Sequence, residues 1–140
     1  MGKVEVVEEI AAPAAKVWEL IREFGAVDRW AAGVESCSVE GEGVGAVRTL
    51  GMAGGLSLQE KLESFDDAGR SFGYAIVGDN PLPFRNYHSV VTVEEKGADR
   101  CTYTWTGTFE AEPATEAQAS GIIRSIYTGG IQSLRKALGV

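Results

Sequence analysis

Three polar side chains occupy strand positions that turn them toward an apolar interior. Within residues 56–62, alternation puts Glu60 on the same face as three leucines, and within residues 86–93 it puts Tyr87 and Ser89 beside two valines. A buried polar group without a partner costs about 1–3 kcal/mol, so these three side chains need hydrogen-bond partners or water. The pattern predicts that they form the polar end of an otherwise apolar pocket.

Glu60 has two other interpretations that the residues leave open. It would pair with a nearby base such as Arg48 and serve only to hold the sheet together. In an enzyme of the cyclase or aldol type, Glu60 would be the general base and Tyr87 would hold the developing oxyanion. The chain has no His or Lys on a predicted inward face to assist such a reaction, so a binding protein is the main hypothesis.

Aromatic residues share the inward face of residues 100–110. Tyr103, Trp105 and Phe109 alternate with threonines, and they are either ligand-stacking residues or simply core. Gly107 among them indicates space between the sheet and whatever packs on it. The pair Gly129-Gly130, inside a predicted helix, indicates either a helix break or a cavity.

Composition excludes several classes of function. The net charge of −7, with 13 scattered Lys and Arg residues, argues against nucleic-acid binding. One His, and two Cys without metal-ligand spacing, argue against a zinc site, and we expect no cofactor. No apolar run approaches the roughly 20 residues of a membrane span. The N-terminus lacks a signal-peptide pattern, so we expect a cytoplasmic protein that is a monomer or weak homodimer.

The elements that must position these residues are one strand, two short helices, six further strands and a long helix, in a single domain over residues 1–140. A helix opens at Pro13 and its apolar spacing continues to Phe24; a second short helix covers 26–32, with Trp30 as its anchor. The predicted strands are 3–10, 34–40, 45–50, 56–65, 70–77, 85–95 and 100–110.

The final helix has the clearest boundaries. Thr115 and Gln118 match a capping box, and Gly139 ends the helix. Its apolar stripe comprises Ile122, Ile123, Ile126, Tyr127, Ile131, Leu134 and Leu138. A long helix with one such stripe must lie across a sheet, so the fold class is α+β with an antiparallel sheet.

Segments spread over the chain carry a family resemblance. Ala12-Pro13 followed by Val17-Trp18 is similar to the start of the START-like (SRPBCC) superfamily, and 58–62 and 85–93 resemble segments of PYR/PYL-type abscisic acid receptors. The resemblance implies the helix-grip fold, a curved seven-stranded antiparallel sheet around the C-terminal helix.

The same resemblance assigns expected roles to particular residues. Glu60, Tyr87 and Ser89 match positions that line the ligand cavity and hold water, and Tyr74, Ile76, Ile122 and Ile126 match its walls. A mobile gate is implied at Met52, Ala53, Gly54 and Gly55, and a latch at Leu82, Pro83 and Phe84. Glu35 falls where those receptors carry the lysine that pairs with the hormone's carboxylate. An inward carboxylate there would repel an acidic ligand.

Three functions therefore follow as hypotheses. The first is a carrier or receptor that binds a small hydrophobic molecule in a cavity between the sheet and the C-terminal helix, with Glu35, Glu60, Tyr74, Ile76, Tyr87, Ser89, Trp105, Ile122 and Ile126 around it. The second is the polyketide cyclase or aromatase type of enzyme. The third is a protein-interaction module whose cavity is structural.

Overall fold

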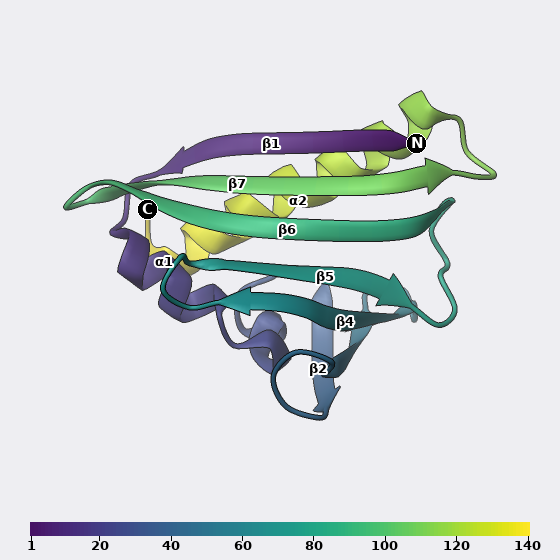
Figure 1. Cartoon of the computed structure of the whole chain (residues 1–140), viewed down its shortest axis with the longest axis horizontal. Helices are drawn as coiled ribbons and strands as arrows, with labels where there is room; N and C mark the ends of the chain where they lie inside the picture. The colour runs from purple at the N-terminus through teal and green to yellow at the C-terminus, as the bar shows by residue number, and fades with distance from the viewer.

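Seven antiparallel strands form one curved sheet in the computed structural model of residues 1–140 (Figure 1). The strands are β1 (Gly2–Ile10), β2 (Val34–Glu40), β3 (Val47–Met52), β4 (Ser57–Asp66), β5 (Ser71–Val77), β6 (Phe84–Gly97) and β7 (Arg100–Ala111). Their order is β1-β7-β6-β5-β4-β3-β2. Six consecutive strands thus form a meander, and the first strand pairs with the last. The predicted strands are confirmed, with ends within two residues of those observed.

Two short helices follow β1, as predicted, with boundaries that differ from the prediction. Helix α1 (Ala14–Ile21) ends one turn early, and the second element is a 3₁₀ helix, η1 (Phe24–Arg29). The reason lies at Glu23, whose extended backbone (φ −80°, ψ 96°) interrupts the helical path. Phe24 is consequently not the last apolar position of α1. Its ring instead lies 4.0 Å from the Arg48 guanidinium carbon, which fixes η1 over β3.

The long helix α2 (Glu116–Leu138) has the predicted ends. Thr115 Oγ1 accepts a hydrogen bond from the Gln118 N–H, and Gln118 Oε1 accepts one from the Thr115 N–H. Gly139 closes the helix in the left-handed conformation, with φ 76°. Gly129 and Gly130 do not break it. No helix of the protein is both long and apolar enough to cross a membrane.

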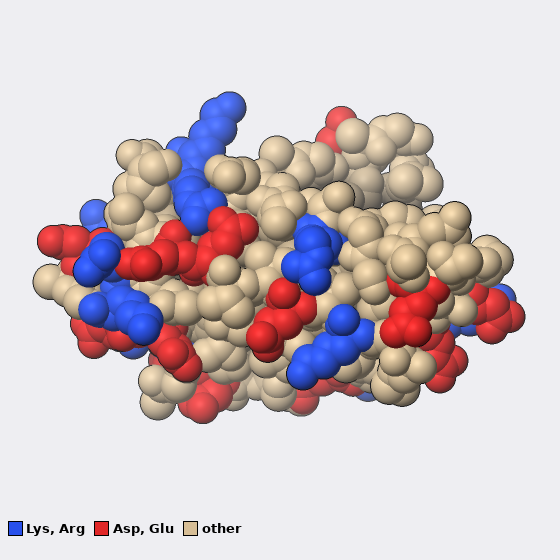
Figure 2. Space-filling view, turned by 90° about the horizontal axis from the view of Figure 1, so that it is seen from above, with Lys and Arg blue, Asp and Glu red and all other residues tan.

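Arginines of α2 attach the helix to the edge strand β1. Arg135 Nη1 lies 2.7 Å from Glu8 Oε1, and its Nη2 donates to the Glu9 carbonyl at 2.8 Å. In the view of Figure 2, basic and acidic side chains are interspersed. One exposed ion pair joins Arg100 of β7 to Glu9 of β1 at 3.0 Å. Because α2 makes its main contacts with β1 and β7, it does not pack closely on β3, β4 and β5.

A continuous apolar core joins α2, α1 and the inner face of the sheet. The side chains that α2 buries in it are Ala119, Ile123, Tyr127, Ile131 and Leu134. Ile122 is only partly buried and Ile126 is 45 % exposed, so the predicted stripe is wider than the buried one. The strand faces are confirmed: Tyr87, Ser89, Tyr103 and Trp105 all point into the interior.

Candidate ligand pocket between the sheet and helix α2

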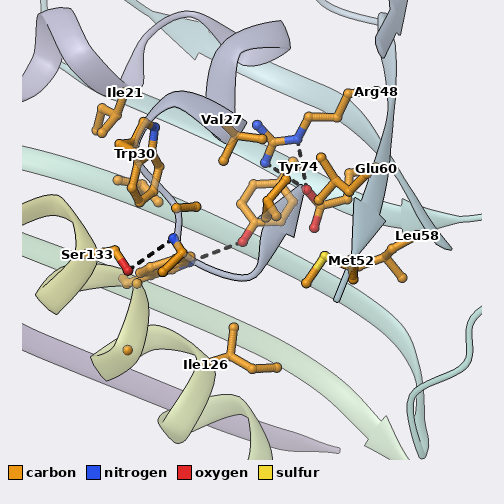
Figure 3. Close-up of a pocket in the computed structure, with 18 of the residues that line it drawn as sticks. Ile21, Val27, Trp30, Arg48, Met52, Leu58, Glu60, Tyr74, Ile126 and Ser133 are labelled. Atoms are coloured by element: carbon orange, nitrogen blue, oxygen red, sulfur yellow. Dashed lines mark hydrogen bonds and ion pairs between the residues drawn. The ribbon is translucent and has the colours of Figure 1, made fainter. Parts of the chain in front are cut away.

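The space between α2 and the β3–β5 half of the sheet is a pocket of about 440 Å³ (Figure 3). Seventeen of its 24 lining residues are hydrophobic, so its wall is mainly apolar. The 24 lining residues come from α1, η1 and the loop after it, strands β2 to β7, the β3–β4 and β5–β6 loops, and α2. The exposed lining residues include Leu56 after the β3–β4 turn, Pro81 in the β5–β6 loop and Ile126 on α2. These three mark the mouth.

One ion pair provides the charge in the pocket wall. Arg48 on β3 and Glu60 on β4 lie directly opposite each other in the ladder, and their side chains are 7 % and 8 % exposed. Arg48 Nη2 lies 2.7 Å from Glu60 Oε1, and Arg48 Nε donates to the same oxygen at 2.9 Å. Arg48 Nη1 donates to the Phe24 carbonyl at 3.0 Å. The pairing of Glu60 with Arg48 and its place in the pocket wall are therefore both realised.

A buried hydrogen-bond network lies behind the pocket wall. Trp105 Nε1 donates to Ser89 Oγ at 2.9 Å and lies 3.2 Å from the Tyr74 hydroxyl. Ser89 Oγ lies 3.0 Å from the Tyr127 hydroxyl, which in turn bonds to the Tyr87 hydroxyl. The Trp105 ring stacks on Tyr127, with centroids 4.3 Å apart. The network satisfies these polar groups without water and holds Trp105 rigidly in the wall.

Burial controls the ionisation of the phenols in this region. It raises the pKa of Tyr74, Tyr87, Tyr103 and Tyr127 above the ordinary value, because the charged phenolate would lose its solvation. The negative charge of Glu60 acts in the same direction on the pKa of Tyr74. All four tyrosines are therefore neutral hydrogen-bonding groups near neutral pH, and none is a ready base.

Several residues that sequence reasoning proposed for ligand contact line the pocket. They are Glu60, Tyr74, Trp105 and Ile126 in the walls, with Met52 and Leu82 from the two proposed loops. In Figure 3, Arg48, Glu60 and Met52 lie at one end, and Trp30 and Ser133 lie at the other. One residue of each proposed loop thus lies in the pocket wall, while the role of these loops as a gate and a latch stays a prediction.

Other proposed residues lie elsewhere, and the prediction of their place in the pocket wall is wrong. Glu35 is exposed, because it is the extra residue at a register shift in the edge strand β2. Tyr87 and Ser89 are buried in the network behind the wall, so Glu60 and Tyr87 do not form the proposed base and oxyanion pair. Ile76 packs against the core beside the pocket.

The remaining corrections concern the loops and α2. Ile122 and Pro83 line an adjoining open groove along the first half of α2, which meets the pocket at Ser125 and Ile126. Phe84 is 1 % exposed and belongs to the core, since it begins β6. Ala53, Gly54 and Gly55 form the β3–β4 turn and do not reach the pocket. Gly54 and Gly55 adopt φ values of 85° and 81°, which glycine accommodates without strain.

Small residues of α2 line the pocket: Gly129 and Gly130 agree with the cavity alternative of their prediction, whereas Ser133 was not predicted. Ile126, Gly129, Gly130 and Ser133 all line the pocket, and their spacing of i, i+3, i+4 and i+7 places them on one side of the helix. Ser133 Oγ also accepts a hydrogen bond from the Ala32 N–H at 3.1 Å, which joins α2 to the loop after η1. A stripe of small residues beside an apolar stripe was the signal available in the sequence.

A sheet wrapped around a C-terminal helix, with an apolar pocket between them, defines the helix-grip class of proteins. The family described as "Polyketide cyclase / dehydrase and lipid transport" matches residues 1–139, so the chain belongs to this family.

Named relatives agree with this assignment. The chain is 37 % identical over 95 residues to the abscisic acid receptor PYL2 of Arabidopsis thaliana, a match that covers 64 % of this chain and 50 % of PYL2. The chain thus spans about half the length of this curated relative. The protein XoxI from Bacillus cereus is 29 % identical with a TM-score of 0.90, over 98 % of this chain and 95 % of XoxI.

A plant enzyme shares the fold at lower identity. Norcoclaurine synthase from Thalictrum flavum, solved with dopamine and hydroxybenzaldehyde, has a TM-score of 0.73 at 17 % identity, over 97 % of this chain and 85 % of the enzyme. At this identity the likeness concerns the fold alone.

Proposed function

We propose that this protein binds a small apolar molecule in the pocket between α2 and the β3–β5 half of the sheet. The observation that carries the proposal is a 440 Å³ space with a mainly hydrophobic wall, open at a mouth formed by Leu56, Pro81 and Ile126. The family includes lipid transport, and PYL2 is named as a receptor for a small molecule. Both are consistent with a binding role.

Binding would rest mainly on removal of apolar surface from water. Burial of about 250 Å² of apolar ligand surface stabilises a complex by about 6 kcal/mol, before the loss of ligand freedom is subtracted. A rigid wall increases the net free energy of binding, because the protein loses little conformational freedom when the ligand binds. Trp105 is held in place by stacking on Tyr127 and by its bond to Ser89.

The test compares native and denatured masses of gently purified protein and its variants. A bound molecule should appear in the native mass and disappear on denaturation. Gly129→Leu places a side chain in the pocket, because nothing lies within 4 Å of a Cβ at position 129, and it should abolish the bound mass. Gly121→Leu, on the same helix but outside this pocket, is the matched control. If the protein carries no molecule and no apolar compound raises its melting temperature, the proposal fails.

A further inference from the structure

The pocket wall carries one positive and one negative charge, which compensate each other. Among the 24 lining residues, Arg48 and Glu60 are the two that carry charge, and they are paired with each other at 2.7 Å. A ligand carboxylate that approached Arg48 would also meet Glu60, and it would lose its own hydration in an apolar wall. The pocket therefore disfavours anions as well as unpaired cations.

Arg48 is also held away from a ligand by its other contacts. Its Nε and Nη2 both contact Glu60 Oε1, and its Nη1 donates to the Phe24 carbonyl. The Phe24 ring covers one face of the guanidinium at 4.0 Å, and the Tyr74 ring lies 5.4 Å away. The geometry is that of a structural cation whose counter-ion is already present.

Glu60 keeps one acceptor open. Both of its contacts with Arg48 use Oε1, and Oε2 receives no hydrogen bond from the protein. Trp30 Nε1 is the one fully buried side-chain nitrogen or oxygen that has no hydrogen-bond partner. Because Glu60 Oε2 also has no partner but is not fully buried, it remains accessible. A buried carboxylate oxygen facing a pocket is a strong acceptor for a hydroxyl proton.

We infer that the ligand is an uncharged apolar molecule with a hydroxyl group that donates a hydrogen bond to Glu60 Oε2. This inference rests on the proposed binding function. Glu60 is 6 % exposed, whereas Leu56 and Ile126 at the mouth are 51 % and 45 % exposed. The hydroxyl group therefore lies against a buried part of the wall, and the apolar body extends toward the exposed mouth residues.

The experiment uses three compounds of one shape: 2-naphthalenemethanol, 2-methylnaphthalene and 2-naphthoate, titrated at pH 7.5 and followed by fluorescence. A hydrogen bond to a charged group is worth about tenfold in affinity. The alcohol should therefore bind about tenfold more tightly than the hydrocarbon, and the carboxylate should bind most weakly.

Two variants then test the role of Glu60. Glu60→Gln leaves Arg48 without its counter-ion, so the alcohol should lose about tenfold in affinity and 2-naphthoate should gain a similar factor. Glu63→Gln is the matched control, because Glu63 lies on the same strand but is exposed and paired with His88. It should leave all three affinities unchanged.

The outcomes test the hydroxyl assignment and the proposed binding function separately. Equal binding of the alcohol and the hydrocarbon to the unmodified protein, or tighter binding of the carboxylate, overturns the hydroxyl assignment and leaves the apolar pocket intact. Failure of all three compounds to bind counts against the binding function itself. The ratios in the unmodified protein decide the question even if Glu60→Gln does not fold.

Discussion

The hydroxyl of Tyr127 on α2 lies so close to residue 107 on β7 that a Cβ at position 107 would clash with it. A Cβ there would also come within 3.2 Å of a ring carbon of Tyr87. Gly107 thus does not open the ligand pocket. Its position among aromatic residues had indicated such a space, and this prediction is wrong. Gly107 admits the phenol that links α2 to the network of Ser89 and Trp105.

Gly107→Ala should destabilise the protein by about 1–3 kcal/mol, because an added methyl group overlaps a rigid phenol in a packed core. Urea denaturation measures the loss. Gly107→Ala in a Tyr127→Phe background removes the overlapping oxygen, so the alanine should cost less there than in the parent. An equal cost in both backgrounds would show that the hydroxyl is not the obstacle.

Gly129→Ala and Gly130→Ala form a matched pair on α2. Alanine in a helix interior is favoured over glycine by about 1 kcal/mol, and a Cβ at 129 meets nothing within 4 Å. A Cβ at 130 would lie 2.9 Å from the Trp105 ring, which is fixed by stacking. We expect Gly129→Ala to raise the melting temperature and Gly130→Ala to give a lower value than Gly129→Ala. The reverse order would contradict the assigned packing.

Arg48→Met should cost about 3–5 kcal/mol of stability, because it leaves Glu60 buried without its counter-ion. The double variant Arg48→Met, Glu60→Gln should lose less, since no unpaired charge remains. Urea denaturation of both measures the difference. Glu63→Gln, which breaks only the exposed pair with His88, should change stability by less than about 1 kcal/mol. A double variant less stable than Arg48→Met would refute the explanation.

Stability should fall steeply in alkali. Burial raises the pKa of all four tyrosines, so above pH about 10 the unfolded chain releases phenol protons that the folded chain retains. This contribution is intact below pH 10 and is lost as pH rises toward the folded pKa values, at about 1.4 kcal/mol per pH unit for each tyrosine.

Tyrosinate absorbance near 295 nm follows this transition, and it should appear together with the loss of circular dichroism. Tyr103→Phe should reduce the slope by about a quarter, since one of the four buried phenols is removed. Tyrosinate that forms while the protein stays folded would contradict the burial of these groups.

Local sequence patterns were sufficient to predict most of the fold. Turn glycines and alternation predict all seven strands, and the capping box at Thr115 and the glycine at 139 predict the ends of α2. These features depend on neighbours in the chain, so the sequence alone contains them. The inward position of Glu60 and the possibility of its pairing with Arg48 were available for the same reason.

The lining of the pocket was decided by tertiary structure. Alternation tells which face a residue occupies, but not whether that face meets a cavity or a packed side chain. Tyr87 and Ser89 face inward as predicted, yet Tyr127 of α2 reaches them and removes them from the pocket. Glu35 turns outward at a register shift that depends on how β2 pairs with β3. Where α2 crosses the sheet depends on contacts between residues more than 100 positions apart, such as Arg135 with Glu8, and no local pattern encodes that placement.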